Sequence, residues 1–413
     1  MTKDDPLSLV ITGHVDHGKS TLIGRLLYDT ESLPPDKIQE AERASASQGR
    51  ETEFAYLLDH LEEERRQGVT IDTTQVFFET RRRRYVIIDA PGHVEFIRNM
   101  ITGATQAQAA VLIVDAAEGV REQTRRHAYM LSLLGLHPLV VVVNKMDLVN
   151  FSEDRFHEMR RSIEEFLEPT GLKPSLHIPI SAFRGDNVAG RSANMKWYTG
   201  PTFLEALDTL QGTPPPTDKP LLVSIQDVYT IDGRRINVGR VESGVLRKGL
   251  EVQVLPDGRT TTVNSIEKFL EAPESAVSGE CIGLTTQSVD LDRGDVLCLP
   301  DQEPILSDRI SARIFWMAGQ DLTRGTDLTM RCTTQETACK VERIRKRIDS
   351  SRLEMIEQNA EILKELEVGE VTIRTDRPML TKDFTDVPSL GRFVLAHGEA
   401  VCAGGIVTQE SSR

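Results

Sequence analysis

The sequence predicts a mainly parallel α/β domain followed by two small β-barrel domains. From the N-terminus to Gly212, short apolar runs alternate with helical patterns, which is the alternation that a parallel sheet requires. The Pro-rich segment Gly212–Asp218 then interrupts this pattern as a stiff linker. After Lys219 the chain consists of short β-rich runs separated by turns, a texture typical of small closed barrels.

The first domain is expected over residues 1–212. Its apolar runs predict the strands Leu7–Ile11, Val76–Glu79, Tyr85–Asp89, Ala110–Val114, Leu139–Asn144 and His177–Ser181. Its helical periodicity predicts the helices Ser20–Tyr28, Ala55–Gln67, Val94–Ala104, Arg121–Leu134, Glu153–Glu168 and Phe203–Thr209.

The two barrels are expected over residues 219–303 and 304–413. The first should contain the runs Leu221–Val228, Ile236–Val241, Glu251–Leu255, Thr260–Ile266, Glu280–Thr286 and Asp295–Leu299. A second boundary lies near the prolines Pro300 and Pro304. Beyond it, the same texture returns at Arg309–Trp316, Asp327–Cys332, Ala338–Arg343, Glu370–Thr375 and Arg392–Leu395.

The composition is that of a globular chain with more than one core. At 413 residues, two or three domains are expected. No run resembles a signal peptide or a membrane span, so a cytoplasmic location is expected. The five cysteines form no C-x-x-C pair, which favours reduced, mostly buried thiols. The net charge of −14 argues against a broad nucleic-acid-binding face, although a local basic patch remains compatible with it.

One local basic run does exist, Arg81–Arg84, and it lies between two strand-like runs. This position predicts the tip of a β-hairpin. A charge run of this kind is usually a solvated turn, and that interpretation is favoured. A contact to a nucleic acid or an acidic partner is the alternative.

The stretch Gly13–Thr21 reads G-H-V-D-H-G-K-S-T and joins an apolar run to a helical pattern. This is the phosphate-binding G-x-x-x-x-G-K-S motif in its strand-to-helix context. Its glycines leave room for backbone N–H groups to surround a β-phosphate, Lys19 would reach the β- and γ-oxygens, and Ser20 would offer a hydroxyl to Mg²⁺. The nucleotide-binding residues expected here are Gly13, His14, Val15, Asp16, His17, Gly18, Lys19, Ser20 and Thr21.

Two further stretches complete the phosphate end of the expected site. Asp89-Ala90-Pro91-Gly92-His93 follows an apolar strand, so Asp89 can hold Mg²⁺ through a water and the Gly92 N–H can meet a γ-phosphate. The segment Gly68–Asp72 supplies Thr70, whose hydroxyl binds Mg²⁺ only when a γ-phosphate draws the loop in. The expected metal ligands are therefore Ser20, Thr70 and Asp89.

Asn144-Lys145-Met146-Asp147 ends another apolar strand and has the chemistry to select guanine. A carboxylate accepts hydrogen bonds from both N1–H and the 2-amino group of guanine, whereas adenine offers neither. Asp147 is therefore the expected base selector. Ser181-Ala182 would present a backbone N–H to guanine O6. Together these motifs predict GTP and Mg²⁺ as cofactors of a P-loop GTPase domain.

The motifs resemble those of the translation-factor class of GTPases, through the strings G-H-V-D-H-G-K-S-T, G-V-T-I-D, D-A-P-G-H and N-K-M-D. Within this class the chain is similar to the large GTP-binding subunit of heterodimeric sulfate adenylyltransferase. That narrower resemblance rests on Gln123–His127, Gly185–Val188, Trp197–Thr202, Phe315–Met317 and Gly391–Phe393. The W-Y-x-G-P-T string is also similar to archaeal and eukaryotic elongation factors, and Val238–Gly244 resembles an elongation factor at least as much.

The narrower resemblance implies a regulatory GTPase that couples GTP hydrolysis to adenylylsulfate formation from ATP and sulfate by a smaller catalytic subunit. The alternative is an elongation factor Tu-like GTPase that delivers aminoacyl-tRNA. The sequence contains neither an S-G-G-x-D-S nor an H-x-G-H string, and it reaches Arg413 without a second phosphate loop. Adenylyl transfer is therefore expected on the partner subunit.

The resemblance also implies catalytic roles. His93 would position the water that attacks the γ-phosphate, with Lys19 and Thr70 completing the catalytic set. No arginine in these motifs is an obvious finger, so slow turnover stimulated by a partner is expected. Val15 and Val69 resemble the apolar pair that shields the γ-phosphate in this class, although apolar residues beside a buried loop need no such role.

Four other residues carry weaker expectations. His14 and His17 lie within the phosphate loop and are interpreted as structural. Asp16 is a hypothetical ligand of a monovalent cation near the phosphates. Trp197 and Tyr198 are expected to anchor the first domain rather than to form a substrate platform.

Overall fold

The computed structural model describes residues 6–33, 74–89, 107–211, 215–231, 233–268, 271–302 and 304–408. The chain divides into two compact units. The first comprises residues 1–213 and 350–353, and the second runs over residues 214–349 and 354–413. The expected boundaries at residues 212, 219, 303 and 304 stay predictions. Among the described residues, no helix is long and apolar enough to cross a membrane.

The first unit is built on one sheet with the strand order β2-β3-β1-β4-β5-β6. Its strands are β1 (Leu7–Gly13), β2 (Thr74–Glu79), β3 (Arg84–Asp89), β4 (Ala109–Asp115), β5 (Leu139–Asn144) and β6 (Pro174–Pro179). The pairings from β3 through β6 are parallel, and only β2 runs antiparallel to its neighbour. Every residue of β4 and β5 is buried, as expected for central strands covered on both faces.

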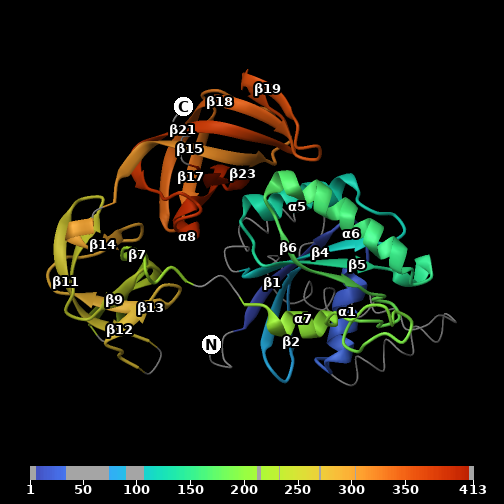
Figure 1. Ribbon diagram of the computed structural model, residues 1–413. Helices are drawn as coiled ribbons and strands as arrows, with labels where there is room; N and C mark the ends of the chain where they lie inside the picture. Colours follow the sequence, from blue (N-terminus) through green and yellow to red (C-terminus); the bar gives the residue numbers. More distant parts are fainter. Residues whose placement is uncertain are drawn as a thin grey trace. The chain divides into compact units, whose positions relative to one another are not determined.

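The described helices of this unit are α1 (Lys19–Asp29), α5 (Glu122–Leu133), α6 (Glu153–Leu167) and α7 (Phe203–Thr209). In Figure 1, α1 and α7 lie on one face of the sheet and α5 and α6 on the other. The apolar side chains of α1 and α7 share one core with β1, β4 and β5. The expected helices at 55–67 and 94–104 lie outside the described residues.

Local sequence explains where these helices begin and end. Ser152 caps α6 by accepting from the Arg155 N–H at 3.3 Å, and acidic residues occupy the first turn. Thr202 and Glu205 form a reciprocal capping box at the start of α7. At the other end of α6, the helix gives way to a 3₁₀ turn, Glu168–Thr170, which contains Pro169.

The second unit contains two β structures. A closed barrel with the order β10-β11-β13-β8-β7-β14 is followed by a seven-stranded sheet with the order β17-β22-β23-β15-β21-β18-β19. Strand β17 pairs with both β22 and β18, so the second sheet also closes on itself and β19 extends beyond the ring. The expectation of two barrels is therefore confirmed.

The strands of this region are β7 (Leu222–Ile231), β8 (Arg234–Ser243), β9 (Val245–Arg247), β10 (Glu251–Leu255), β11 (Arg259–Glu267), β12 (Ser275–Val277), β13 (Cys281–Thr286) and β14 (Val296–Cys298). Strands β9 and β12 form a separate two-stranded sheet beside the barrel strands. The later elements are β15 (Leu306–Trp316), β16 (Leu322–Thr323), β17 (Asp327–Cys332), β18 (Gln335–Asp349), β19 (Met355–Ala360), β20 (Ile362–Leu363), β21 (Glu367–Leu380), α8 (Pro388–Gly391), β22 (Arg392–His397) and β23 (Ala400–Val407).

The two β structures share a small apolar cluster, which explains why they form one unit. Leu222 and Val296 of the first barrel pack in this cluster with Leu380, Val387 and Leu390 of the second. The cysteines are mostly buried, as expected. Cys298, Cys332, Cys339 and Cys402 lie inside the β structures, and Cys281 is exposed.

Candidate nucleotide-binding site

The loop Gly13–Lys19 joins the end of β1 to the start of α1, as the sequence motif requires. Both glycines are needed for steric reasons. A Cβ atom on Gly13 would lie 2.4 Å from the Ile113 carbonyl oxygen. Gly18 has a φ of 91°, and a Cβ there would lie 2.4 Å from the Asn144 side-chain nitrogen. The loop is therefore packed tightly against β4 and the end of β5.

Lys19 is the one cationic side chain of this loop. Its Nζ donates to the carbonyl oxygens of Gly13 and His14, each at 3.0 Å. Both acceptors belong to the loop itself, so the ammonium group already lies over the region that the motif assigns to phosphate. The backbone N–H of Val15 donates to the Gln123 side chain of α5 at 3.4 Å, so this part of the loop is bonded to another element.

The base end of the site is formed where β5 and β6 finish. Asn144 is 2% exposed and connects two loops through its side-chain amide. Its Nδ2 donates to the His17 carbonyl at 2.9 Å, and its Oδ1 accepts from the Ala182 N–H at 2.9 Å. The sequence did not predict this link between the two loops. The Ala182 N–H, which is expected to donate to guanine O6, donates here to the Asn144 side chain.

Asp147 follows at the same end of the sheet and is half-buried. The Ser181 hydroxyl donates to its Oδ1 at 2.6 Å and itself accepts from the Arg184 N–H at 3.2 Å. Among the described residues, no hydrogen bond to the other carboxylate oxygen is found. The structure thus brings Asp147, Ser181 and Ala182 together, with one carboxylate oxygen still able to accept from a base.

Asp115 is a further member of the site that the motif search missed. It ends β4, is 1% exposed, and lies 2.8 Å from the Lys145 Nζ through its Oδ2. Burial alone would raise the pKa of Asp115. Hydrogen bonds from Lys145 and from the backbone N–H groups of Glu118 and Ala117 instead hold that pKa below its usual range. The sequence did offer a signal for Asp115, because it places this carboxylate at the end of a buried strand, as it does the other site residues.

His17 is fully buried and packs against β4. Its Nδ1 lies 3.3 Å from the Ile113 carbonyl, and burial lowers the pKa of His17 to about 4. The ring is therefore neutral at pH 7 and donates from Nδ1. His14 lies edge-on to it, with ring centroids 5.1 Å apart. These contacts support the structural interpretation of both histidines.

Several expected site residues cannot be placed. Thr70, Gly92 and His93 lie outside the described residues, as does Val69. The backbone of Asp89 ends β3 opposite Thr74, and its side chain is outside the described part of the chain. The described residues contain no group of three or more His, Cys, Asp or Glu side chains that could hold a metal ion. The Mg²⁺ site therefore stays a prediction.

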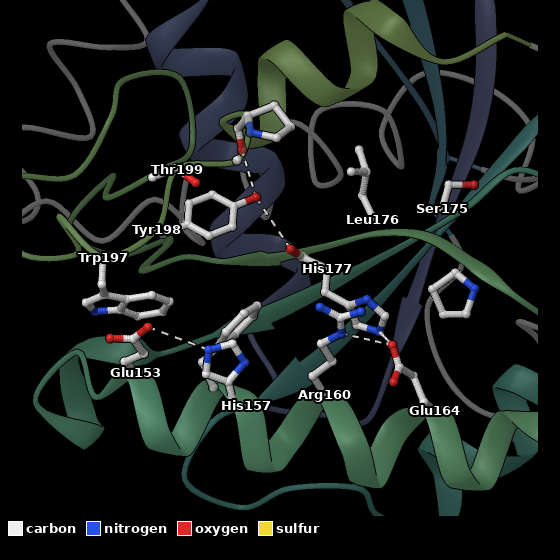
Figure 2. Close-up of a pocket in the computed structure, with 14 residues that line it drawn as sticks. Glu153, His157, Arg160, Glu164, Ser175, Leu176, His177, Trp197, Tyr198 and Thr199 are labelled. Atoms are coloured by element: carbon white, nitrogen blue, oxygen red, sulfur yellow. Dashed lines mark hydrogen bonds and ion pairs between the residues drawn. The ribbon is translucent and has the colours of Figure 1, made fainter.

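Trp197 and Tyr198 lie away from these motifs, along a shallow hollow of about 420 Å³ between α6 and β6 (Figure 2). The Trp197 Nε1 donates to the Phe151 carbonyl at 3.0 Å, and the Tyr198 hydroxyl donates to the Pro201 carbonyl at 3.1 Å. Both side chains are thus held by the first unit itself. On the opposite wall, His177 faces Glu164, with Nε2 3.8 Å from the carboxylate.

Comparison with known proteins gives matches over nearly the whole chain. Family models match for the elongation factor Tu GTP binding domain over residues 5–213, elongation factor Tu domain 2 over residues 234–298, and the GTP-eEF1A C-terminal domain-like family over residues 309–408.

Several relatives that match over their full length are named elongation factor 1-alpha. Elongation factor 1-alpha of Methanopyrus kandleri is 42% identical, covering 98% of each chain. That of Saccharolobus solfataricus is 40% identical, also covering 98% of each chain, and that of Methanosphaerula palustris is 38% identical, covering 98% of this chain and 97% of its own. A crystal structure of sup35 complexed with GDP aligns with 98% of this chain and 94% of its own, with 26% identity and a TM-score of 0.46.

These matches overturn the expectation of a sulfate adenylyltransferase subunit. Relatives at 37–42% identity over the full chain are elongation factors 1-alpha, so the expected role in adenylylsulfate formation and the expected catalytic partner subunit are both wrong. The phosphate and guanine motifs are common to both classes of GTPase, because both bind the same nucleotide. The narrower assignment therefore depended on short strings such as Gln123–His127, and these did not distinguish the two classes of GTPase.

Proposed function

Because the chain belongs to the elongation factor Tu/elongation factor 1-alpha family of GTPases, we propose that it binds aminoacyl-tRNA in its GTP-bound state and releases it after GTP hydrolysis. The observation that carries this proposal is the extent of the match. Relatives named elongation factor 1-alpha are similar over 98% of this chain, which includes both β structures as well as the GTP-binding domain. A GTP-binding domain alone would leave the class of GTPase open.

Guanine selection in this proposal rests on Asp147. One of its carboxylate oxygens accepts from Ser181, and the side chain lies just beyond the end of β5, in the 3₁₀ turn Met146–Val149. Such a carboxylate can accept both N1–H and the 2-amino group of guanine. Lys145, held by Asp115 at 2.8 Å, lies in the same loop and would flank the base.

The phosphate end supplies charge stabilisation. Lys19 would exchange the carbonyl oxygens of Gly13 and His14 for β- and γ-phosphate oxygens, which are stronger acceptors because they are charged. Mg²⁺, when bound, neutralises phosphate charge, and Ser20, Thr70 and Asp89 would hold it. Ser20 fits this role, since within the described residues its hydroxyl has no hydrogen-bond partner.

Hydrolysis requires a positioned water, and His93 is the residue we assign to it. Replacing His93 with alanine should leave GTP affinity within a few-fold and lower stimulated hydrolysis by about 10²-fold, the usual scale for a lost acid–base or positioning group. Unchanged stimulated turnover would remove His93 from the mechanism.

The test of the function itself is protection of aminoacyl-tRNA. The ester bond of aminoacyl-tRNA should hydrolyse more slowly with the protein and GTP than with the protein and GDP. Deacylated tRNA should not compete for binding. Equal protection with both nucleotides, or no protection at any protein concentration, would contradict the proposal.

A further inference from the structure

The β2–β3 hairpin carries the basic run that the nucleotide site leaves unused. The two strands pair from Thr74 opposite Asp89 to Glu79 opposite Arg84, so the run lies at the tip, as the sequence predicts. We call residues Thr80–Arg84 the arginine tip. Arg81 and Arg82 are exposed, and within the described residues neither guanidinium has an ion-pair or hydrogen-bond partner.

The arginine tip is held in place by α7. Thr80 donates from its hydroxyl to the Asp208 carboxylate at 2.8 Å, and the Tyr85 hydroxyl donates to the same carboxylate oxygen at 2.6 Å. Arg83 donates to the Leu210 carbonyl at 2.9 Å, just beyond the end of α7. The Thr80 hydroxyl also accepts from the Arg82 and Arg83 N–H groups, which closes the turn.

The four arginines therefore have different tasks. Arg83 fixes the turn to α7, and Arg84 lies 3.6 Å from Glu79 across the hairpin. The guanidinium groups of Arg81 and Arg82 make no contribution to this packing, and they remain as two exposed charges on a turn fixed by the neighbouring contacts. Rigid presentation lowers the conformational entropy lost when a partner binds.

The same hairpin carries an exposed aromatic ring. Phe77 is 59% exposed on β2, while its neighbour Phe78 is buried and stacked on Tyr85. Phe77 lies on the same face of the hairpin as Arg84, because Phe77 pairs with Val86 and Glu79 with Arg84. Unpaired cations and an exposed aromatic ring on one hairpin are the combination that binds phosphates and stacks on bases.

We propose that the arginine tip and Phe77 form an RNA contact, in which Arg81 and Arg82 bind backbone phosphates. This inference deepens the proposed function, since aminoacyl-tRNA and the ribosome both present RNA. An acidic peptide would also attract the two charges, but it offers no base for Phe77 to stack on. The chain has a net charge of −14, so most of its surface repels a polyanion. The positive charge of the arginine tip would therefore orient an approaching RNA.

The test compares the double variant R81Q/R82Q with a matched control, K173Q/K196Q, which removes two charges from exposed lysines of the same unit. Binding to poly(U), to aminoacyl-tRNA with GTP, and to ribosomes is measured between 50 and 200 mM KCl. Each lost phosphate contact should reduce the salt slope of log K by about 0.7–0.9. R81Q/R82Q should thus lower the slope by about 1.5 and weaken binding by about 10-fold at low salt, while the control should not.

The three arms separate this inference from the proposed function. Poly(U) reports on the arginine tip even where aminoacyl-tRNA does not bind, and the tRNA and ribosome arms show which RNA uses it. Phe77→Ala should weaken poly(U) binding by about 5-fold without changing the slope, because stacking is insensitive to salt. GTP affinity should be the same for all variants. Equal slopes for R81Q/R82Q and wild type in every arm would overturn the RNA contact, as would poly(glutamate) binding as tightly as poly(U) with no effect of Phe77→Ala.

Discussion

At the base end of the nucleotide site, side chains form hydrogen bonds with groups of other loops, whereas at the phosphate end the Lys19 side chain is bonded to carbonyls of its own loop. Asn144 connects His17 to Ala182, and Ser181 holds Asp147. The Lys19 Nζ donates to the carbonyl oxygens of Gly13 and His14, which belong to its own loop. The base end is thus organised before a nucleotide arrives, and the phosphate end must exchange bonds when one binds.

This difference predicts which property each substitution changes. Removing Lys19 should weaken binding most for the nucleotide that carries the most phosphates. Removing Asn144 should weaken every guanine nucleotide equally and destabilise the empty protein. The following predictions run from the largest expected effect to the smallest.

Lys19→Ala should lower affinity for GTP by about 10³-fold, since two charge-assisted hydrogen bonds of about 1.5–3 kcal/mol each are lost. Affinity for GDP should fall by about 10- to 100-fold, because only the bond to the β-phosphate is lost. GMP has no β-phosphate for Lys19 to reach, so its affinity should change little. Titration calorimetry with the three nucleotides measures the pattern, and Lys173→Ala serves as a control on an exposed lysine. If the variant lost as much affinity for GMP as for GTP, Lys19 would not act on the β- and γ-phosphates alone, and the phosphate end and the base end could not be distinguished in this way.

Asp147→Asn should lower GTP affinity by about 10²-fold, because the hydrogen bonds to N1–H and the 2-amino group are impaired. Xanthosine triphosphate, which carries an oxygen in place of the amino group, should bind better than to wild type. Competition binding measures both nucleotides, with the exposed Asp154→Asn as control. Wild-type protein that bound ATP as tightly as GTP would show that Asp147 does not select the base.

Asn144→Ala should lower the affinities for GTP, GDP and GMP together by about 10- to 100-fold. It leaves the buried His17 carbonyl and Ala182 N–H unsatisfied, at about 1–3 kcal/mol each. The nucleotide-free variant should therefore also unfold at lower urea, whereas Asn194→Ala, at an exposed asparagine, should not. Unchanged stability of the nucleotide-free Asn144 variant would contradict the pre-organised base end.

The phosphate end should also make stability depend on pH through His17. Its pKa is about 4 in the folded protein, below the usual 6.5. Above pH 6.5 the ring is neutral in both states. Between pH 6.5 and 4 only the unfolded chain takes up the proton, so stability falls as pH falls, by about 1 kcal/mol at pH 5.5.

His17→Gln should remove this part of the pH dependence in urea unfolding of the nucleotide-free protein. The exposed His157→Gln is the control and should keep the wild-type profile. His177, whose pKa burial also lowers to about 4, contributes separately in the same range. A His17→Gln profile parallel to that of wild type would assign the whole dependence to His177 and other groups.

Sequence by itself determined the local features of this protein. The alternation of apolar and helical runs fixed the order of strands and helices, because periodicity depends on neighbouring residues alone. The phosphate and guanine motifs indicated the nucleotide for the same reason, since each is a short string at a strand end. The Arg81–Arg84 run likewise predicted a hairpin tip, and the strands on either side pair as expected. Strand boundaries depend on more than the local pattern: β6 covers Pro174–Pro179 rather than the predicted His177–Ser181.

Only the tertiary structure decided which residues meet. Asn144 bonds a carbonyl 127 positions before it and an N–H 38 positions after it, and no string contains that information. The pairing of Asp115 with Lys145 and the closure of the last sheet by β17 and β18 are of the same kind. Such contacts depend on how separate strands are brought side by side. A backbone pattern predicts each strand, but long-range packing alone sets the distance between their ends.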